Sequence, residues 1–263
     1  MQHVSKLIVF TDIHMTVKLR AGCPEPESRL RAGLAHALSS VPDADMILLM
    51  GDLTHWGDRG AYRKLRAVLE DVPLPVVPML GNHDNRAKFR EIFPETPVDG
   101  SGFVQRVIPL GAHRLITLDT LIAPREGDAF SHAGELCPAR LAWLDAALTE
   151  AGDAPCIVAM HHPPHATGFE AMDGIMLRDG EAFHDLIARH GTVQQILCGH
   201  IHRTIFGSYR GTPYAVFKSP VGQMPLIFAG DDTSVECHDP PAFGIVIAHD
   251  SGVMVHTEDF PAP

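Results

Sequence analysis

The sequence predicts an α/β protein in which strands and helices alternate along the chain. Five short apolar runs, rich in β-branched residues, have the length and composition of buried strands, and amphipathic stretches lie among them. Each of the five runs is followed closely by residues whose side chains bind metal ions. Because open α/β sheets carry their active sites at the carboxyl ends of the strands, this repeated placement predicts one site built from five loops.

The predicted strands and the motifs behind them come in a fixed order. The strands are Val4–Phe10, Asp45–Met50, Val76–Leu80, Cys156–Met160 and Val193–Cys198. The motifs that follow them are Asp12-Ile13-His14, Gly51-Asp52, Gly81-Asn82-His83-Asp84, His161-His162 and Gly199-His200-Ile201-His202. Five separate runs that obey one rule indicate a common site more strongly than any single motif does.

Four stretches between these strands have the apolar spacing of helices that cover a sheet. In one of them Leu30, Leu34 and Leu38 recur every four residues. The predicted helices are Glu27–Ser40, Arg59–Asp71, Ala139–Ala151 and Glu181–His190.

Three further pairs of strand-like runs are predicted to form antiparallel hairpins, and two of them lie near the C-terminus. They are Phe103–Ile108 with His113–Leu118, Ile205–Tyr209 with Tyr214–Phe217, and Ala242–His249 with Val253–Thr257.

The chain has no internal repeat, low-complexity stretch or long linker, and we expect one domain over residues 1–263 with an antiparallel or cap segment at about 219–263. Two irregular segments, Met15–Pro26 and Ser219–Pro241, are rich in turn-forming residues. Either segment could frame a substrate pocket or a contact between subunits.

Composition narrows the class of partner. The 263 residues are 45% hydrophobic and 20% charged, which is typical of a globular protein, and no apolar run is long enough to cross a bilayer. The apolar stretch near the N-terminus is too short for a signal peptide, so we expect a cytoplasmic protein without a membrane partner. The net charge of −11 and the lack of a basic stripe in the sequence argue against a nucleic-acid polymer as partner.

Cysteine usage predicts neither a disulfide framework nor a structural zinc site, because the number is odd and no pair is spaced C-x-x-C. The five are Cys23, Cys137, Cys156, Cys198 and Cys237, and we expect Cys156 and Cys198 to be buried. Of the 17 histidines, His36, His184 and His190 are expected to be solvated residues on helices.

The first two motifs supply carboxylates. Asp12 and His14 are two residues apart, so in an extended segment both side chains can reach one ion. Asp52 follows a glycine that permits a tight turn, and its two oxygens can bridge two ions. Taken singly, the first motif could equally be a solvated loop, and Asp52 could be a turn or helix-capping residue.

The third motif supplies an amide oxygen from Asn82 and a candidate acid, His83, that could protonate a leaving oxygen. A left-handed turn at Asn82 and a hydrogen-bonded loop histidine at His83 are the alternatives.

The last two motifs supply imidazoles. Of the adjacent His161 and His162 only one should point at the metal, and we expect His161, with His162 behind it. His200 and His202 share a side of a short segment. His165 could reach the substrate together with Asn82 and His83, although an ordinary loop histidine is the simpler interpretation.

The seven expected ligands are Asp12, His14, Asp52, Asn82, His161, His200 and His202. They suit two divalent ions, and mixed nitrogen and oxygen ligands without thiolate are compatible with Mn, Fe, Zn or Co. Two divalent ions and two aspartates would leave a local charge of about +2, enough to hold an anionic ester on an acidic protein.

The motifs D-x-H, G-D, G-N-H-D, H-H-P-P and G-H-x-H in this order resemble the calcineurin-like metallophosphoesterase superfamily. The resemblance covers residues 4 to 217 and is closest to class III cyclic nucleotide phosphodiesterases and binuclear glycerophosphodiesterases. It implies a four-layer α/β/β/α sandwich and His83 as the catalytic histidine. It also implies one ion on Asp12, His14, Asp52 and His202, and a second on Asp52, Asn82, His161 and His200.

Two departures separate the chain from other branches of this superfamily. Purple acid phosphatases place a tyrosine ligand where this chain has His55. The Ser/Thr protein phosphatase pattern G-D-x-x-D-R-G is displaced at Asp58-Arg59-Gly60, and its G-N-H-E motif ends here in Asp84.

The resemblance implies hydrolysis of a small phosphodiester, a cyclic nucleotide or a glycerophosphodiester, by a metal-bound hydroxide. The alternatives are a phosphomonoesterase of the same superfamily and, less favoured, a metal-binding scaffold for protein partners. Related enzymes commonly pair through C-terminal segments, so a homodimer or higher homo-oligomer is expected.

Overall fold

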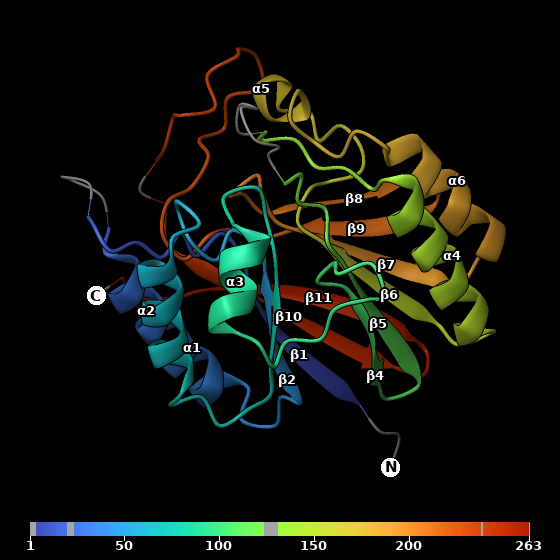
Figure 1. Cartoon of the computed structure of the whole chain (residues 1–263), viewed down its shortest axis with the longest axis horizontal. Coiled ribbons are helices and arrows are strands. Elements are labelled where there is room, and N and C mark those ends of the chain that lie inside the picture. The colour runs from blue at the N-terminus through green and yellow to red at the C-terminus, as the bar shows by residue number, and fades with distance from the viewer. Residues whose placement is uncertain (1–3, 20–23, 124–130, 238, 263) are drawn as a thin grey trace.

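The computed structural model describes residues 4–19, 24–123, 131–237 and 239–262, and it contains two β-sheets that pack face to face (Figure 1). Cys23 lies outside the described residues. The first sheet has the order β11-β10-β1-β2-β3, and the second has the order β4-β5-β6-β7-β9-β8. Three parallel strands, β1 to β3, form one side of the first sheet, while β5, β6, β7 and β9 run parallel in the second.

The strands have the following bounds: β1 Ser5–Phe10, β2 Met46–Met50, β3 Val76–Met79, β4 Arg106–Leu110, β5 His113–Leu118, β6 Cys156–Met160, β7 Val193–Cys198, β8 Ile205–Tyr209, β9 Thr212–Val216, β10 Ala242–His249 and β11 Gly252–Asp259. The helices are α1 Pro26–Ser40, α2 Arg59–Leu69, α3 Arg86–Ile92, α4 Pro138–Ala151, α5 Glu170–Asp173 and α6 Gly180–His190.

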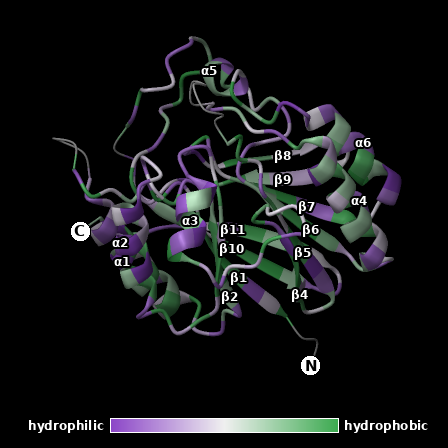
Figure 2. Cartoon of the chain, in the orientation of Figure 1, coloured by the Kyte–Doolittle hydropathy of each residue, from purple (hydrophilic) through white to green (hydrophobic). Residues whose placement is uncertain are grey.

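The four layers follow from the alternation of side chains along each buried strand. In β1, Ile8 and Phe10 pack with the residues of α1 to α3, whereas Leu7 and Val9 pack between the two sheets. The second sheet is likewise buried on both faces, with α4 and α6 on its outer side. Burial on both faces explains why β2, β3 and β6 are apolar at every position. Hydrophobic residues gather in the central strands, and hydrophilic residues gather on the outer helices and loops (Figure 2). The predicted four-layer α/β/β/α sandwich is confirmed.

The hairpins differ slightly from the prediction because their turns are tighter. Pro109 and Leu110 belong to β4, since Leu110 pairs with His113 across Gly111-Ala112. Likewise Tyr209 pairs with Thr212, and Arg210-Gly211 forms a two-residue turn with positive φ at both positions. Within the expected C-terminal segment, β10 pairs antiparallel with β1, and β11 pairs antiparallel with β10 at the edge of the first sheet.

Two helices were not predicted. Helix α3 is short and highly charged, and it is capped by the preceding Asn85, whose side chain accepts a hydrogen bond from Lys88 N. The other, α5, is a single turn. Helices this short have too few turns for a hydrophobic periodicity to be recognised in the sequence.

Other expectations can be compared directly with the described residues. Cys156 and Cys198 are fully buried, as predicted. His184 is buried rather than solvated, because it packs beneath His165 and Tyr209. No helix in the described ranges is both long and apolar enough to cross a membrane.

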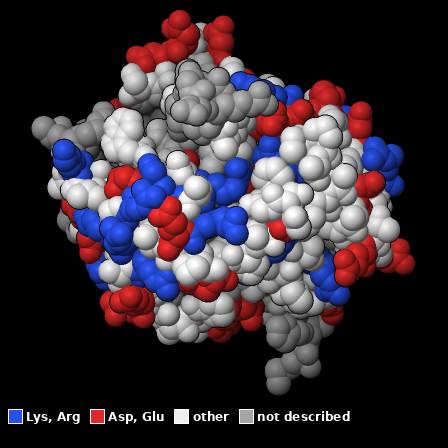
Figure 3. Space-filling model, in the orientation of Figure 1, with Lys and Arg blue, Asp and Glu red and all other residues white. Residues whose placement is uncertain are grey.

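The surface charge is less uniform than the sequence suggested. Lys and Arg side chains gather on one face of the molecule, around α2 and α3 (Figure 3). Acidic partners are interleaved with them, since Arg59 pairs with Glu91 and Arg66 with Glu95.

Candidate metal centre

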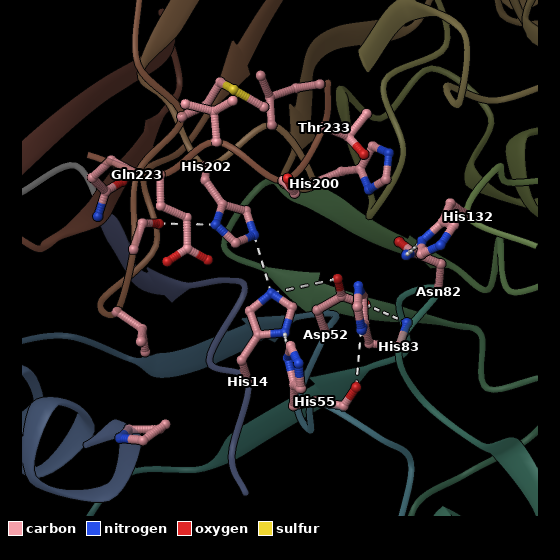
Figure 4. Close-up of a pocket in the computed structure, with 18 of the residues that line it drawn as sticks. His14, Asp52, His55, Asn82, His83, His132, His200, His202, Gln223 and Thr233 are labelled. Atoms are coloured by element: carbon pink, nitrogen blue, oxygen red, sulfur yellow. Dashed lines mark hydrogen bonds and ion pairs between the residues drawn. The ribbon is translucent and has the colours of Figure 1, made fainter. Parts of the chain in front are cut away.

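The five polar loops meet at one end of the two sheets. The loops after β1, β2 and β3 come from the first sheet, and those after β6 and β7 come from the second. His14, Asp52, Asn82, His83, His200 and His202 point toward a common space in Figure 4. This convergence is the arrangement that the sequence predicted.

The first group of side chains lies around His14. Its Nε2 is 3.1 Å from Nε2 of His202 and 3.8 Å from a carboxylate oxygen of Asp52. Nε2 of His202 is 3.3 Å from Oδ1 of Asp12. Asp12, His14 and His202 thus bring one ligand atom each close enough to bind a single ion.

The second group lies around His161. Its Nε2 is 3.3 Å from Oδ2 of Asp52 and 3.8 Å from Oδ1 of Asp12. The rings of His161 and His200 have centroids 5.3 Å apart. Asp52 lies beside both groups, as a ligand shared by two ions must.

Three buried polar atoms in this region make no hydrogen bond within the described residues: Asn82 Oδ1, His161 Nε2 and His200 Nε2. Buried polar groups are nearly always paired, so unpaired atoms that share one site need an explanation. All three belong to the predicted ligand set. A pair of divalent cations would satisfy them, and the donor set of carboxylate, amide and imidazole suits such ions.

The backbone conformation also marks the expected ligands as parts of a functional site. Six non-glycine residues in the described part of the chain have positive φ, and five of them are expected ligands. The ligands are Asp12, His14, Asp52, His200 and His202, with φ between 48° and 71°. Such conformations are unfavourable for residues with a side chain and cluster at functional sites.

Glycines permit the close approach of the loops. Gly51 has φ +93°, which allows the turn that the sequence predicted before Asp52. At Gly81 a side chain would overlap Asp52 and would come within 2.7 Å of Nε2 of His161. The glycine of the G-N-H-D motif is therefore required for contact between the third loop and the other two.

Without metal, protons on histidines partly balance the negative charges of Asp12 and Asp52. Burial alone would raise the pKa of Asp52, but the nearby imidazoles of His161 and His83 outweigh it and hold the pKa well below its usual range. Burial lowers the pKa of His161, yet Asp52 and Asp12 outweigh this and raise it to about 9. Burial and the neighbouring His83 keep the pKa of His14 well below its usual value. The centre therefore attracts positive charge, which bound cations would supply in place of protons.

His83 stands at the edge of this centre. Its backbone N–H donates to Oδ1 of Asp52 at 2.8 Å, and its ring Nδ1 lies 2.9 Å from the carbonyl oxygen of His55. The ring is half-buried and lines the cavity described below.

Two other predicted histidines lie behind the centre. His162 is buried, with Nδ1 2.7 Å from the hydroxyl of Thr120 and Nε2 3.2 Å from the carbonyl of His132. His162 also has a ring nitrogen within 4.8 Å of ligand atoms of His161 and His200, so the expectation that only His161 of the pair binds metal stays a prediction. His165 is not among the described residues that line the cavity, because its ring is buried between His184 and the rings of Tyr209 and Tyr214.

Sequence reasoning assigned no role to three residues that the structure places at the centre. Asp84 accepts hydrogen bonds from both the Asp52 loop and Gly81 N. His55 lies beside His14, and Nδ1 of His132 lies 3.4 Å from Nδ2 of Asn82. Asp84 could have been found from the sequence, because it belongs to the motif Gly81-Asn82-His83-Asp84. His132 belongs to no motif, so the sequence offered no way to find it.

A cavity of about 390 Å³ opens onto the candidate ligands. Thr16, Lys18, Leu19, Pro24 and Pro26 line it from the first irregular segment, and Val221 to Met224 and Thr233 to Glu236 line it from the second. Both segments thus line a pocket, which was one of the two roles expected of them, the other being a contact between subunits. Met172, Ile175, Ile201 and Met224 add an apolar stretch to the wall, which elsewhere carries polar and charged side chains such as Lys18 and Glu236.

Comparison with known proteins agrees with this geometry. A family model described as calcineurin-like phosphoesterase matches residues 5–204. A probable cyclic nucleotide phosphodiesterase of Rhodopseudomonas palustris is 37% identical over 97% of this chain and 92% of its own length. A glycerophosphodiester phosphodiesterase of Enterobacter lignolyticus is 34% identical over 75% of this chain and 69% of its own length.

The fold is similar to that of a dimetal phosphatase from Danio rerio. The TM-score is 0.68 at 16% identity, with 98% of this chain and 99% of the other covered. The family match spans all five motifs that are expected to bind metal, including His202 near its end. The chain therefore belongs to the calcineurin-like phosphoesterase family.

Proposed function

We propose that the protein is a binuclear metal-dependent phosphodiesterase that hydrolyses small phosphodiesters. One ion would be held by Asp12, His14, Asp52 and His202, and the other by Asp52, Asn82, His161 and His200. The observation that carries this proposal is the convergence of three buried ligand atoms beside a cavity with Asp12 and Asp52. These atoms, Asn82 Oδ1, His161 Nε2 and His200 Nε2, make no hydrogen bond within the described residues, and His161 Nε2 has only its ion-pair contacts with the two aspartates. Either Mn, Fe, Zn or Co fits the mixed nitrogen and oxygen ligands.

Two bound divalent ions would supply a nucleophilic hydroxide at neutral pH and would neutralise charge on the phosphate oxygens. The chain supplies the remaining parts. The contact of His83 Nδ1 with the His55 carbonyl places one ring proton on Nδ1, so the proton that would pass to the leaving oxygen is a second one, carried on Nε2 in the imidazolium form. His83 would therefore act as the general acid, with Asn82 beside it near the substrate.

The cavity favours cyclic nucleotides over glycerophosphodiesters as substrate. Met172, Ile175 and Met224 pack in one cluster and give the wall an apolar stretch, which suits the flat face of a nucleobase. Both activities occur in the names of relatives, since one is a probable cyclic nucleotide phosphodiesterase and another a glycerophosphodiester phosphodiesterase.

The first experiment separates diester from monoester hydrolysis. Metal-reconstituted protein should turn over bis-p-nitrophenyl phosphate faster than p-nitrophenyl phosphate. The reverse preference would favour the phosphomonoesterase alternative. Failure to hydrolyse any diester with both ions bound would revive the scaffold alternative.

The second experiment addresses the apolar wall. Met224→Lys should raise KM for a cyclic nucleotide more than KM for bis-p-nitrophenyl phosphate, because only the nucleotide needs that wall for its base. An equal effect on both substrates would contradict the assignment of the base to this wall.

We also propose that the chain forms a homodimer or higher homo-oligomer through the segment 219–241. Leu226, Ile227 and Phe228 are 60%, 50% and 58% exposed there, and three adjacent exposed apolar residues are typical of an interface. Light scattering on the wild type and on a variant with aspartate at all three positions tests this, since the variant should be monomeric.

A further inference from the structure

His55 lies next to the proposed metal centre without belonging to the proposed ligand set. It follows Asp52 by three residues, and its ring Nδ1 is 3.3 Å from Nδ1 of His14. In Figure 4 the ring of His14 stands between His202 on one side and His55 on the other. The Nε2 atom of His14 thus faces the proposed metal centre, and its Nδ1 atom faces His55.

The two nitrogens of His14 have different tasks in this arrangement. Nε2 is the nitrogen that approaches His202 and Asp52, so Nε2 is the atom that would bind an ion. A neutral imidazole that binds through Nε2 carries its proton on Nδ1. That proton needs an acceptor, because the side chain of His14 is only 12% exposed.

His55 can supply this acceptor. When its own proton is on Nε2, its Nδ1 is a lone pair directed at the Nδ1–H of His14. Metal-binding histidines usually donate their second N–H to a carboxylate, a carbonyl or water, and such partners fix the orientation and tautomer of the ligand. Here a second histidine would take that part.

The position of His55 is well defined by the backbone. Its N–H donates to the carbonyl of Met15 at 3.0 Å, and His14 N–H donates to the carbonyl of Asp52 at 2.9 Å. These bonds tie the loop after β2 to the loop that carries His14. The ring of His55 also packs edge-on against Trp56 and stacks at 23° on His83.

The carbonyl of His55 has a separate role, because it lies 2.9 Å from Nδ1 of His83. A change of side chain at position 55 removes the contact with His14 but leaves a carbonyl in the chain. The contribution of the ring can therefore be measured apart from that of the backbone.

We propose that His55 is a positioning residue for the proposed binuclear centre. Its Nδ1 accepts the hydrogen bond from Nδ1–H of His14 and so fixes the ring that binds one of the two ions. This inference rests on the proposed function. Its competitor is a third ion bound by the facing nitrogens of His14, His55 and His83, which lie within 4.8 Å of one another. The contact of His83 Nδ1 with the His55 carbonyl favours a hydrogen-bonded arrangement over that competitor.

The test compares three substitutions of one residue. His55→Asn places an acceptor near the former Nδ1, His55→Gln carries its polar group farther out, and His55→Leu has none. Each protein is stripped with chelator and titrated with Co(II), and the bound ions are counted by elemental analysis and followed by the cobalt absorption spectrum. The control is His256→Leu, because His256 is exposed on β11.

The expected result is two ions per wild-type chain and a loss confined to one of them. Affinity for that ion should fall about 10- to 100-fold in His55→Leu and His55→Gln, and most of it should return in His55→Asn. The other ion and the His256→Leu control should be unaffected. Should His55→Leu fail to fold, the comparison of Asn with Gln still decides the outcome.

Three results would overturn the inference while leaving the proposed function intact. They are unchanged affinity for both ions in His55→Leu, equal losses in the Asn and Gln variants, and a third wild-type ion that disappears with His55. A wild type that binds fewer than two ions would instead refute the proposed function itself.

Discussion

The hydroxyl of Tyr62 donates a hydrogen bond to Oδ1 of Asp84 across 2.9 Å in the buried core beneath the candidate metal centre. The same carboxylate accepts from the N–H groups of Leu53, Thr54 and Gly81 and from the hydroxyl of Thr54. Asp84 thereby joins helix α2 to the two loops that carry Asp52 and Asn82.

Asp84→Asn should destabilise the protein, because an amide offers one acceptor oxygen where two oxygens receive five donors. At least two buried donors would lose their partner, and we expect a loss of about 3–5 kcal/mol in the free energy of unfolding. Urea unfolding of the metal-free protein measures this. Asp250→Asn, in the exposed turn after β10, should lie within about 0.5 kcal/mol of wild type. Equal values for both variants would remove Asp84 from its structural role.

Asp52→Ala should abolish turnover and release at least one ion. Asp52 is near His14 and His161 and also accepts the N–H of His83, so its loss affects both groups of ligands. We expect activity to fall at least 100-fold, with a metal content below two ions per chain by elemental analysis. Full activity in a metal-stripped Asp52→Ala protein would refute the mechanism.

His83→Ala should keep both ions and lose turnover, because His83 is proposed to protonate the leaving oxygen rather than to bind metal. A decrease of about 10²–10⁴-fold in kcat is expected for a cyclic nucleotide, whose leaving group is an alkoxide. The loss should be smaller for bis-p-nitrophenyl phosphate, since p-nitrophenolate departs without a proton. Equal losses on both substrates would remove the acid role from His83.

His165 should make stability sensitive to mild acid. Burial and the adjacent His184 lower the pKa of His165 to about 4, against an ordinary value of 6.5. The unfolded chain therefore binds this proton more readily, so stability is complete above pH 6.5 and decreases as the pH falls from 6.5 toward 4. In metal-stripped protein, the difference in Tm between pH 7 and pH 5 should shrink in His165→Phe, which retains an aromatic ring against Tyr209.

His256→Phe is the matched control for this prediction, because position 256 is exposed. It should keep the wild-type dependence of Tm on pH. An unaltered pH dependence in His165→Phe would show that the buried pair of His165 and His184 does not govern acid stability.

The fold could be predicted because its signals are local. Runs such as Cys156–Met160 are apolar at every position, since both faces of the second sheet are covered. The motifs that follow these runs lie at strand ends, so the sheet topology alone brings distant motifs together. Asp12 and His200 are 188 residues apart, yet the Asp12 carboxylate accepts a hydrogen bond from the backbone N–H of His200. The short helix α3 had no such apolar pattern and was missed.

Contacts between loops could not be predicted in the same way. Nothing in the sequence shows that His55 would face His14, or that His165 would turn away from the cavity and stack at 3° on Tyr209. These contacts depend on the path of the backbone through each loop, including the positive φ of His14 and Asp52. Side-chain chemistry limits what a loop residue can do, but the loop conformation decides what it contacts.

The central claim is tested most directly by crystals of the wild type grown with saturating Mn or Co, examined by anomalous scattering. The account predicts two peaks a few ångströms apart, with Asp52 between them and with Asn82 Oδ1, His161 Nε2 and His200 Nε2 directed at one of them. A map without a peak at this centre, or with ions elsewhere only, would contradict it.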